Sequence, residues 1–544
     1  MTPTEILKQY WKYDEFRPGQ ETAIRSVCVD KSDCLVIMST GGGKSVCYQL
    51  AALWARALDN NKSKAIVIVI SPLIALINDQ ISSLLKKGIH AVTYDNYIKK
   101  QEDTVSVVYT TPEKLVRNQA QLRFLHQRKG FTCFAVDECH CISQWGHDFR
   151  QDYTRLGFLK QVFPDVPIMA LTATATQAVE QDILRQLSLH RLAQVIRTPT
   201  DRTNLYVEVH NRDNHDQLLL LKRALHGNPG PVIIYTTTKK DAEKIAMMIQ
   251  TKLKISASHY HADMTTEDRD STQRAFMEGT VRVIVSTVAF GMGVDKPDIR
   301  LILQWGLSKS IEEYVQQIGR AGRDGNQSRC ILYWSYQDLQ SLSNIIKDSR
   351  PNTWQMLLKM QEFASNSLTC RHQMIQQYFR PGQNTLQPCN DQCDNCVHKV
   401  QPIDVEKEVR LLLEIVQLMT PRTHSSIGLE KPISVLVGAS TQKVKEYARH
   451  PLYGVGRHRT ISTWKALARQ LVDGNGNKSH MLLEYKRVVF KGRVMVCYCV
   501  SKEGKEVLSK QKSVGLLYPS SELHTSMGGK RGGKAIQCNI VIVH

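Results

Sequence analysis

The stretch Cys34-Leu35-Val36-Ile37-Met38-Ser39-Thr40-Gly41-Gly42-Gly43-Lys44-Ser45 decides the fold. Its apolar start predicts a buried strand, and the residues from Lys44 onward predict a helix. Glycines between the two let backbone N–H groups converge on phosphate oxygens, and the helix N-terminus adds partial positive charge. The stretch therefore predicts a site for a nucleoside triphosphate such as ATP, with a purely structural glycine turn as the alternative.

The residues of this glycine loop have separate expected roles. Lys44 reaches the β and γ phosphates, and the Ser45 hydroxyl ligates Mg²⁺. Met38 stands where the usual G-x-x-x-x-G-K-[ST] pattern has its first glycine, which leaves the binding residues unchanged. The other residues expected to hold the nucleotide are Thr40, Gly41, Gly42 and Gly43.

An acidic pair after a second apolar run supplies the other half of such a site. Residues 131–136 read as a buried strand, and Asp137 and Glu138 follow it directly. A carboxylate at the carboxyl end of a strand suits Mg²⁺, so we expect Asp137 to hold the metal through its waters. Glu138 is expected to orient and deprotonate the attacking water. A solvated acidic pair is the alternative, and the glycine loop upstream argues against it.

Two arginines form a third component, within Gln316-Gln317-Ile318-Gly319-Arg320-Ala321-Gly322-Arg323. The small residues between Arg320 and Arg323 allow close approach to a ligand. Arginines beside a γ phosphate neutralise charge in the transition state and are worth about 10³ to 10⁵ in rate in other NTPases. We assign Arg320 and Arg323 to this role, with Gln316 in the same catalytic set. The alternative is a solvated basic helix end.

Composition points to the partner. The chain has 544 residues with 71 Lys plus Arg against 51 Asp plus Glu, a net charge of +20. That length predicts three to four domains, and the charge predicts a polyanionic partner, with single-stranded and duplex DNA as the leading candidates. The sequence holds no run of about 18 or more apolar residues and no signal peptide, so we expect a soluble intracellular protein with no membrane partner. The expected compartment is the nucleus in a eukaryote, or the cytoplasm or nucleoid in a bacterium.

Four of the 14 cysteines form a cluster. Cys389, Cys393 and Cys396 have C-x3-C-x2-C spacing in a polar loop, and Cys370 precedes them. Four thiolates at such spacing suit tetrahedral Zn²⁺, with free or redox cysteines as the alternative. Because a structural zinc contributes roughly 10 kcal/mol or more to folding, this module is expected to depend on its metal.

Short apolar strands alternate with helical segments twice along the chain. The pattern predicts an α/β fold with two consecutive parallel sheets, at 1–205 and 206–350, with ATP between them. A zinc module at 351–400 follows, and then helices and a hairpin at 401–510 that fit a winged helix. Residues 511–544 read as a flexible tail. The expected strands include 34–37, 65–70, 105–109, 131–136, 168–171, 232–235, 281–285, 301–303, 485–490 and 494–500.

Across residues 6–510 the ordered motifs resemble those of RecQ DNA helicases, members of superfamily 2 with two RecA-like domains. The Trp-containing segment after DECH is close to diagnostic for the family. The length leaves no room for a further helical domain after the winged helix, so the chain is expected to be similar to the short animal type-one branch. The motifs are FRPGQ (16–20), TGGGKS (40–45), SPLIAL (71–76), TPEK (111–114), DECH (137–140), WGHDFR (145–150), LTATAT (171–176), YHA (260–262), AFGMGVDKP (289–297) and GRAGRDG (319–325).

The resemblance implies roles for residues around the nucleotide and the DNA. Tyr13 and Arg17 would sandwich adenine, and Gln20 would hydrogen-bond its edge. His140 and the loop 143–149 would couple strand binding to hydrolysis. The single-strand contacts expected in and beside that loop are Trp145, Phe149 and Arg150; stacking on such aromatic side chains is worth about 1 to 3 kcal/mol per base, although the two rings could instead be core residues.

The winged helix is expected to meet duplex DNA. Its basic residues would contact phosphates, although a solvated basic surface explains any one of them equally well. Phe490, at the hairpin tip beside Lys491 and Arg493, is a candidate wedge between strands; packing under the wing is the alternative. The basic residues in question are Arg457, Arg459, Lys465 and Arg469.

Four positions depart from the family pattern. None removes a charge that acts on ATP, but Gln317 puts in doubt how efficiently the two sheets lock together. The resemblance implies an ATP- and Mg²⁺-dependent helicase that moves 3′ to 5′ and opens duplexes, forks or recombination and repair intermediates. The alternatives are an annealing factor or translocase that unwinds poorly, and a winged-helix DNA-binding regulator with weak ATPase. The departures are Ser39 for proline, Cys139 for alanine, Gln304 for histidine and Gln317 for glutamate.

Overall fold

The computed structural model divides the chain into two compact units. The first holds residues 1–207, 216–331 and 372–387, and the second holds 208–215, 332–371 and 388–544. No helix in the described part of the chain is long and apolar enough to cross a membrane. The structure describes all residues except 59–64, 101, 147, 190–192, 199–201, 214, 292–294, 350, 382–388, 421–425, 475–480, 491–492, 518, 520–522 and 524–544, and this last range takes in most of the expected tail.

The first unit opens with a seven-stranded sheet in the order β3-β4-β2-β5-β6-β1-β7. Every neighbouring pair of strands in it is parallel. The central strands are continuous apolar runs because both faces of the sheet are buried. The strands are β1 (Cys34–Ile37), β2 (Ile66–Ile70), β3 (Ala91–Thr93), β4 (Val107–Thr110), β5 (Phe131–Val136), β6 (Ile168–Thr172) and β7 (Gln194–Arg197).

Helices cover both faces of this sheet and give it two hydrophobic cores. One core packs the first four helices against the sheet, through residues such as Leu7, Leu50 and Ile77. The other packs the later helices and the η1 and η2 turns against the opposite face. The helical segments are α1 (Pro3–Trp11), α2 (Gln20–Cys28), α3 (Lys44–Leu58), α4 (Ile74–Lys86), α5 (Tyr94–Lys100), α6 (Pro112–Arg117), α7 (Gln119–Lys129), η1 (Cys139–Ile142), α8 (Gln151–Thr154), η2 (Arg155–Gly157), α9 (Phe158–Val162) and α10 (Gln177–Gln186).

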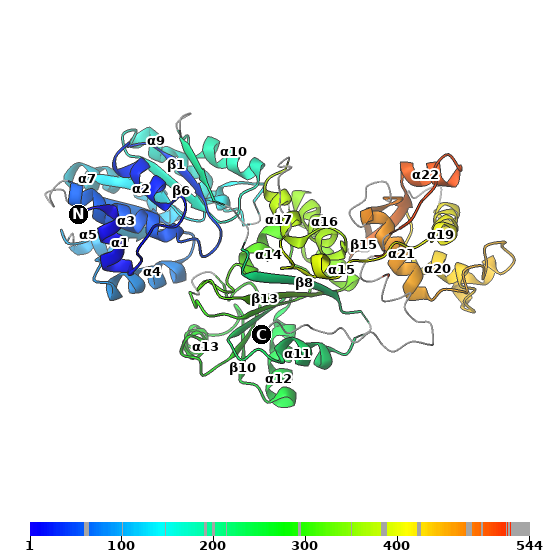
Figure 1. The fold of residues 1–544 in the computed structure, drawn as a ribbon. Coiled ribbons are helices and arrows are strands. Elements are labelled where there is room, and N and C mark those ends of the chain that lie inside the picture. Colours follow the sequence, from blue (N-terminus) through cyan, green and yellow to red (C-terminus); the bar gives the residue numbers. More distant parts are fainter. Residues whose placement is uncertain are drawn as a thin grey trace. The chain divides into compact units, whose positions relative to one another are not determined.

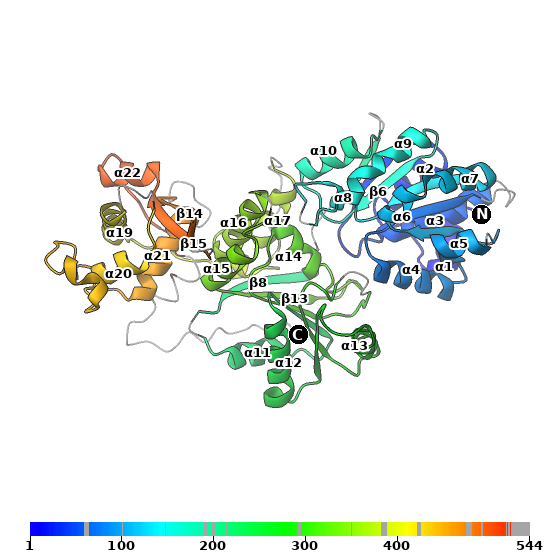
Figure 2. The same cartoon turned by 180° about the vertical axis from the view of Figure 1, so that it is seen from behind.

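A six-stranded sheet follows in the order β10-β11-β9-β12-β13-β8. The pairs β10–β11, β11–β9 and β9–β12 are parallel. Helices α11 and α12 lie side by side against this sheet (Figures 1 and 2). The elements are β8 (Leu205–Asn211), α11 (Gln217–Leu225), β9 (Val232–Thr236), α12 (Lys239–Leu253), β10 (Ala257–Tyr260), α13 (Thr266–Glu278), β11 (Val283–Ser286), β12 (Leu301–Trp305), α14 (Ile311–Ile318), β13 (Ser328–Trp334) and α17 (Arg371–Phe379).

The second unit combines a cysteine module with a helix-and-hairpin domain. Helices α19, α21 and α22 gather around the antiparallel pair β14–β15 (Figures 1 and 2). Their shared core encloses Trp464, whose Nε1 donates to the Gly456 carbonyl at 2.9 Å. The elements are α15 (Tyr336–Ile345), α16 (Pro351–Ser365), α18 (Asp394–Val397), α19 (Glu406–Met419), α20 (Glu430–Leu436), η3 (Gln442–Tyr447), α21 (Ile461–Asp473), β14 (Leu483–Phe490), β15 (Arg493–Val500) and α22 (Lys502–Leu508).

The expected fold class is confirmed: two parallel sheets of RecA type precede the cysteine module and the winged helix. The expected hairpin is also present, and the register pairs Phe490 with Arg493. Residues 491–492 at its tip and the Phe490 side chain lie outside the described part of the chain, so the wedge stays a prediction.

Candidate nucleotide site and metal centre

The glycine loop and the acidic pair meet at one edge of the first sheet. Strand β6 lies between β1 and β5, and the carboxyl ends of parallel strands form the usual ligand edge of such a sheet. The loop holds its shape only with glycine at Gly43, where φ is +84° and an added Cβ would lie 2.3 Å from Gln20 Nε2. Helix α3 begins at the next residue, Lys44.

Three charged side chains converge there. Lys44 is half-buried and its Nζ donates to the Met38 carbonyl at 3.2 Å. Burial lowers the pKa of Lys44, and the carboxylates of Glu138 and Asp137 oppose that shift. Burial and the Glu138 charge raise the pKa of Asp137 to about 7, against the effect of Lys44. Burial that shifts several pKa values in one place is typical of a functional site.

Glu138 is held in an unusual backbone conformation. Its φ is +48°, in the left-handed region that non-glycine residues seldom adopt. Its Oε2 lies 3.2 Å from His140 Nδ1, and that nitrogen also lies 2.9 Å from Thr172 Oγ1. Burial disfavours the imidazolium, but the Cys141 and Glu138 side chains raise the pKa of His140 above its usual value. Such strain at a carboxylate beside a nucleotide loop marks a candidate catalytic group.

The two expected arginines belong to the domain of the second sheet and lie between helix α14 and strand β13. Arg320 is 6% exposed and its Nη1 donates to the Gly291 carbonyl. Burial lowers the pKa of Arg320, and Glu138 is among the groups that oppose this shift. Arg323 pairs with Asp295 at 2.7 Å and packs against Gly41 of the glycine loop. Gln316 is half-buried on α14, which ends at Ile318, before the two arginines.

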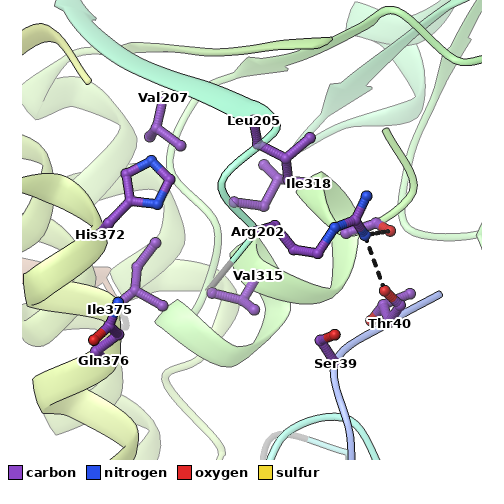
Figure 3. A pocket seen from close by; sticks show the side chains of 11 residues that line it. Ser39, Thr40, Arg202, Leu205, Val207, Val315, Ile318, His372, Ile375 and Gln376 are labelled. Carbon is purple, nitrogen blue, oxygen red and sulfur yellow. Dashed lines mark hydrogen bonds between the residues drawn. The ribbon is translucent and has the colours of Figure 1, made fainter. Parts of the chain in front are cut away.

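Sequence reasoning missed Arg202, which ties the glycine loop to the arginine turn (Figure 3). Its Nη1 donates to the Thr40 carbonyl at 3.1 Å, and its Nη2 donates to the carbonyls of Ala321 and Gly322 at 3.0 and 2.7 Å. These carbonyls come from segments far apart in the sequence. Its Nε also donates to Asn204 Oδ1 at 3.2 Å, but a connector arginine whose distant partners are all backbone atoms leaves no motif to find.

Of the three residues that the resemblance assigns to adenine, one is exposed and the other two contact the glycine loop. Tyr13 is 50% exposed, as a stacking side chain requires. Arg17 Nη1 donates to the Gly41 carbonyl. Gln20 is buried, and its Nε2 donates to the carbonyls of Gly43 and Gly42 at 3.0 and 3.4 Å. The Gln20 amide therefore supports the glycine loop in this structure.

The aromatic loop after Glu138 presents one large ring to solvent. Trp145 is 58% exposed, so it is not a core residue. Phe149 is half-buried. Arg150 Nη1 donates to the Pro72 carbonyl at 2.7 Å, and its Nη2 lies 3.5 Å from Asp148 Oδ2. Trp145 is thus available for stacking, while Arg150 links the loop to the segment before α4.

Most of the basic residues expected to meet duplex DNA have partners within the chain. Arg459 pairs with Glu408 at 2.8 Å, and Lys465 pairs with Glu430. The Arg469 side chain is 19% exposed, with its guanidinium 4.0 Å from the Tyr336 ring centroid. Arg457 is exposed, and among the described residues no ion pair is recorded for it. Arg457 is therefore better placed than Arg469 to meet phosphates.

The four expected cysteines form one cluster. Their sulfur atoms all lie within 4.8 Å of one another. Cys389 and Cys396 are 3.6 Å apart, and Cys393 and Cys370 are 3.9 Å apart. A tetrahedral zinc with Zn–S bonds of about 2.3 Å separates its sulfurs by about 3.8 Å, so the cluster fits this metal. Burial and the neighbouring thiols raise the pKa of Cys389 to about 12, and a cation is what would stabilise the thiolates.

A buried ion pair supports the cluster, and it too was not anticipated. Arg371 is 1% exposed, and its Nε and Nη2 meet the two oxygens of Asp394 at 2.9 and 3.1 Å. Asp394 Oδ2 also accepts from the Val209 backbone N–H at 3.1 Å. Each partner directly follows a cluster cysteine, Cys370 or Cys393, and that adjacency was the available signal.

The fold and the site define a helicase-type ATPase with two RecA-like domains. Four family models match consecutive parts of the chain, and the last two are specific to one family. They are described as DEAD/DEAH box helicase (17–182), helicase conserved C-terminal domain (216–325), RecQ zinc-binding (336–397) and RQC domain (399–523).

Similar proteins show which family of helicases the chain belongs to. The ATP-dependent DNA helicase RecQ of Pasteurella multocida is 38% identical over 491 residues, which cover 87% of this chain and 74% of that protein. The ATP-dependent DNA helicase Q1 of Mus musculus is 36% identical over 436 residues, covering 76% and 65%. A structure of the DEAD-box helicase Mss116 bound to ssRNA shares the fold, with TM-score 0.52, 17% identity and coverage of 63% of this chain and 75% of that one. This chain belongs to the RecQ family of ATP-dependent DNA helicases.

Proposed function

We propose that this chain hydrolyses ATP with Mg²⁺, moves 3′ to 5′ along single-stranded DNA and opens duplex or forked DNA. One observation carries the proposal: Lys44, Asp137 and Glu138 lie half-buried at the ligand edge of the first sheet, close enough that both carboxylates act on the pKa of Lys44. Family membership supports the helicase activity, and the net charge of +20 supports a nucleic-acid partner. The 3′ to 5′ polarity rests on the resemblance to RecQ helicases.

The side chains divide the proposed chemistry among them. Lys44 binds the β and γ phosphates, while Ser45 and Asp137 hold Mg²⁺, which neutralises phosphate charge when bound. Glu138 takes a proton from the attacking water, and its contact with His140 orients the carboxylate. Arg320 and Arg323 stabilise the charge that develops on the transferred phosphoryl group. Arg202 keeps the arginine turn close to the glycine loop.

Zinc has a structural part in this proposal. Cys370, Cys389, Cys393 and Cys396 hold the metal, and the Arg371–Asp394 pair fixes the two segments from which these cysteines come. In the aromatic loop, Trp145 stacks on a base and Arg150 transmits the loop position to the segment before α4.

A strand-separation assay tests the proposal. Two duplexes with the same base pairs carry a single-stranded tail at either the 3′ or the 5′ end, and each is incubated with ATP and Mg²⁺. We expect opening of the 3′-tailed duplex alone, and no opening when EDTA removes the magnesium.

Other outcomes point to specific errors. Preferential opening of the 5′-tailed duplex would reverse the assigned polarity. DNA-stimulated ATP turnover with no strand separation from either duplex would favour an annealing factor or translocase. DNA binding without any stimulated turnover would favour a DNA-binding regulator.

A further inference from the structure

A second group of potential metal ligands lies beside the nucleotide site. It consists of His140 and Cys141 on η1 and Asp148 in the aromatic loop, and one ligand atom from each lies within 4.8 Å of the other two. Cys141 Sγ is 3.8 Å from Asp148 Oδ2. In a tetrahedral zinc site a thiolate sulfur and a carboxylate oxygen are about 3.5 Å apart. The observed geometry is therefore close to that of a zinc site.

The surroundings of His140 match those of a metal-bound histidine. A histidine that binds zinc through one ring nitrogen commonly donates through the other to a carboxylate or another oxygen. In this chain Nδ1 lies 2.9 Å from Thr172 Oγ1 and 3.2 Å from Glu138 Oε2. These contacts fix the ring orientation, and Nε2 is the nitrogen that a metal would take.

Burial and ligand chemistry favour zinc over magnesium at this place. His140 and Cys141 are buried, whereas the Asp148 side chain is 36% exposed and gives access from solvent. A thiolate ligand suits Zn²⁺ and does not suit Mg²⁺. Burial raises the pKa of Cys141, so the thiol is protonated until the metal binds. The raised pKa of His140 keeps its ring protonated as well. Binding then forms the S–Zn and N–Zn bonds, breaks the S–H bond of Cys141 and the Nε2–H bond of His140, and releases both protons to solvent.

We propose that His140, Cys141 and Asp148 form a second, regulatory zinc site, with water as the fourth ligand, whose occupancy slows DNA-stimulated ATP turnover. The mechanism follows from the neighbours of these residues. A metal-bound Asp148 leaves its ion pair with Arg150 and fixes the loop that carries Trp145. The same metal holds His140, which contacts Glu138. A loop fixed in this way no longer transmits DNA binding to hydrolysis.

Metal counting tests the site directly. The full chain, with its four-cysteine site loaded, is equilibrated with buffered free Zn²⁺ and the bound zinc is measured by mass spectrometry. We expect a second equivalent in the parent chain, which is lost in Cys141→Ser and in Asp148→Asn. The matched control is Asp152→Asn on α8, outside the group, which keeps both equivalents. A single equivalent in the parent chain, or two equivalents in Asp148→Asn, overturns the site. Because Asp148 is partly exposed, this variant decides the matter even if Cys141→Ser does not fold.

Inhibition of ATP turnover by zinc tests the regulatory role of the site, and this test rests on the proposed ATPase activity. Each variant is compared with its own rate without added zinc, at constant Mg²⁺ and saturating single-stranded DNA. The zinc concentration for half-inhibition should rise about 10-fold or more in Asp148→Asn and stay unchanged in Asp152→Asn. A second bound zinc without any inhibition overturns the regulatory role. The two proposals fail separately, since zinc uptake is measured without turnover and turnover is measured without added zinc.

Discussion

The zinc module has buried charged side chains and the nucleotide site has half-buried ones, and the two regions differ in how these charges are paired. In the zinc module Arg371 meets the two oxygens of Asp394 at 2.9 and 3.1 Å. In the nucleotide site no ion pair within 4.0 Å joins Lys44 to a carboxylate among the described residues, although Asp137 and Glu138 act on its pKa. Pairing buried charge internally stabilises a fold, whereas a lysine that forms no such pair among the described residues can bind a charged ligand.

This comparison predicts that substitutions in the nucleotide site lower the rate of ATP turnover. We expect the largest effect for Arg320→Ala. The guanidinium is buried beside Gly291 and Glu138 acts on its pKa, so its loss should lower DNA-stimulated ATP turnover about 10³-fold or more. Steady-state ATPase measurements check this. Arg274→Ala, an exposed arginine on α13, is the control. Turnover in Arg320→Ala that equals the control would remove Arg320 from the catalytic set.

Substitutions in the zinc module should instead destabilise its fold. Cys393 is buried in the cluster, so Cys393→Ser should lower bound zinc and expose residues 350–400 to protease, since structural zinc contributes roughly 10 kcal/mol. Metal analysis and limited proteolysis measure both effects. Cys499→Ser, on β15 of the same unit, should keep its zinc. Absence of zinc from the parent chain, purified without chelator, would contradict the assignment.

The buried Arg371–Asp394 pair should contribute to stability although it does not bind the metal. Asp394→Asn removes the charge that pairs with Arg371 and should destabilise the second unit by about 3 to 5 kcal/mol. Denaturant unfolding followed by tryptophan fluorescence measures this. Asp391→Asn changes an exposed aspartate in the adjoining turn and should leave stability unchanged. Equal midpoints for the two variants would show that the pair contributes nothing.

Trp145→Ala should have the smallest effect on stability and a selective effect on function. Because the ring is 58% exposed, its loss should change the free energy of unfolding by only about 0.5 kcal/mol or less. DNA-free ATP turnover should persist while stimulation by single-stranded DNA is lost. Phe124→Ala removes a ring of the same 58% exposure from α7 and should retain stimulation. Normal stimulation of ATP turnover by single-stranded DNA in Trp145→Ala would show that Trp145 does not contact the DNA.

The sequence predicted most of the strands that are continuous apolar runs. Strands β1 (Cys34–Ile37) and β5 (Phe131–Val136) have the expected bounds because both of their faces are buried. Strands β7 (Gln194–Arg197) and β10 (Ala257–Tyr260) were not among those expected. Each contains polar residues and lies at the edge of its sheet, so only pairing with a neighbour shows it to be a strand.

The candidate site was predictable where its residues are close together in the chain. Lys44 follows its glycines directly, and Cys389, Cys393 and Cys396 lie within one loop. Arg202 could not be predicted, because the acceptors through which it joins the two segments are backbone carbonyls more than 100 residues away in the chain. The amide of Gln20 likewise meets carbonyls of the glycine loop, which no residue pattern encodes.

The central claim, that this edge of the sheet binds and hydrolyses ATP, is tested most directly by comparing Glu138→Gln with Lys44→Ala. ATP binding is measured by equilibrium titration, and turnover is measured at saturating single-stranded DNA. Loss of the lysine should abolish binding. Loss of the carboxylate should leave binding near the parent value and lower turnover about 10²- to 10⁴-fold, the usual contribution of a general base. Hydrolysis by Glu138→Gln at the parent rate would contradict the account.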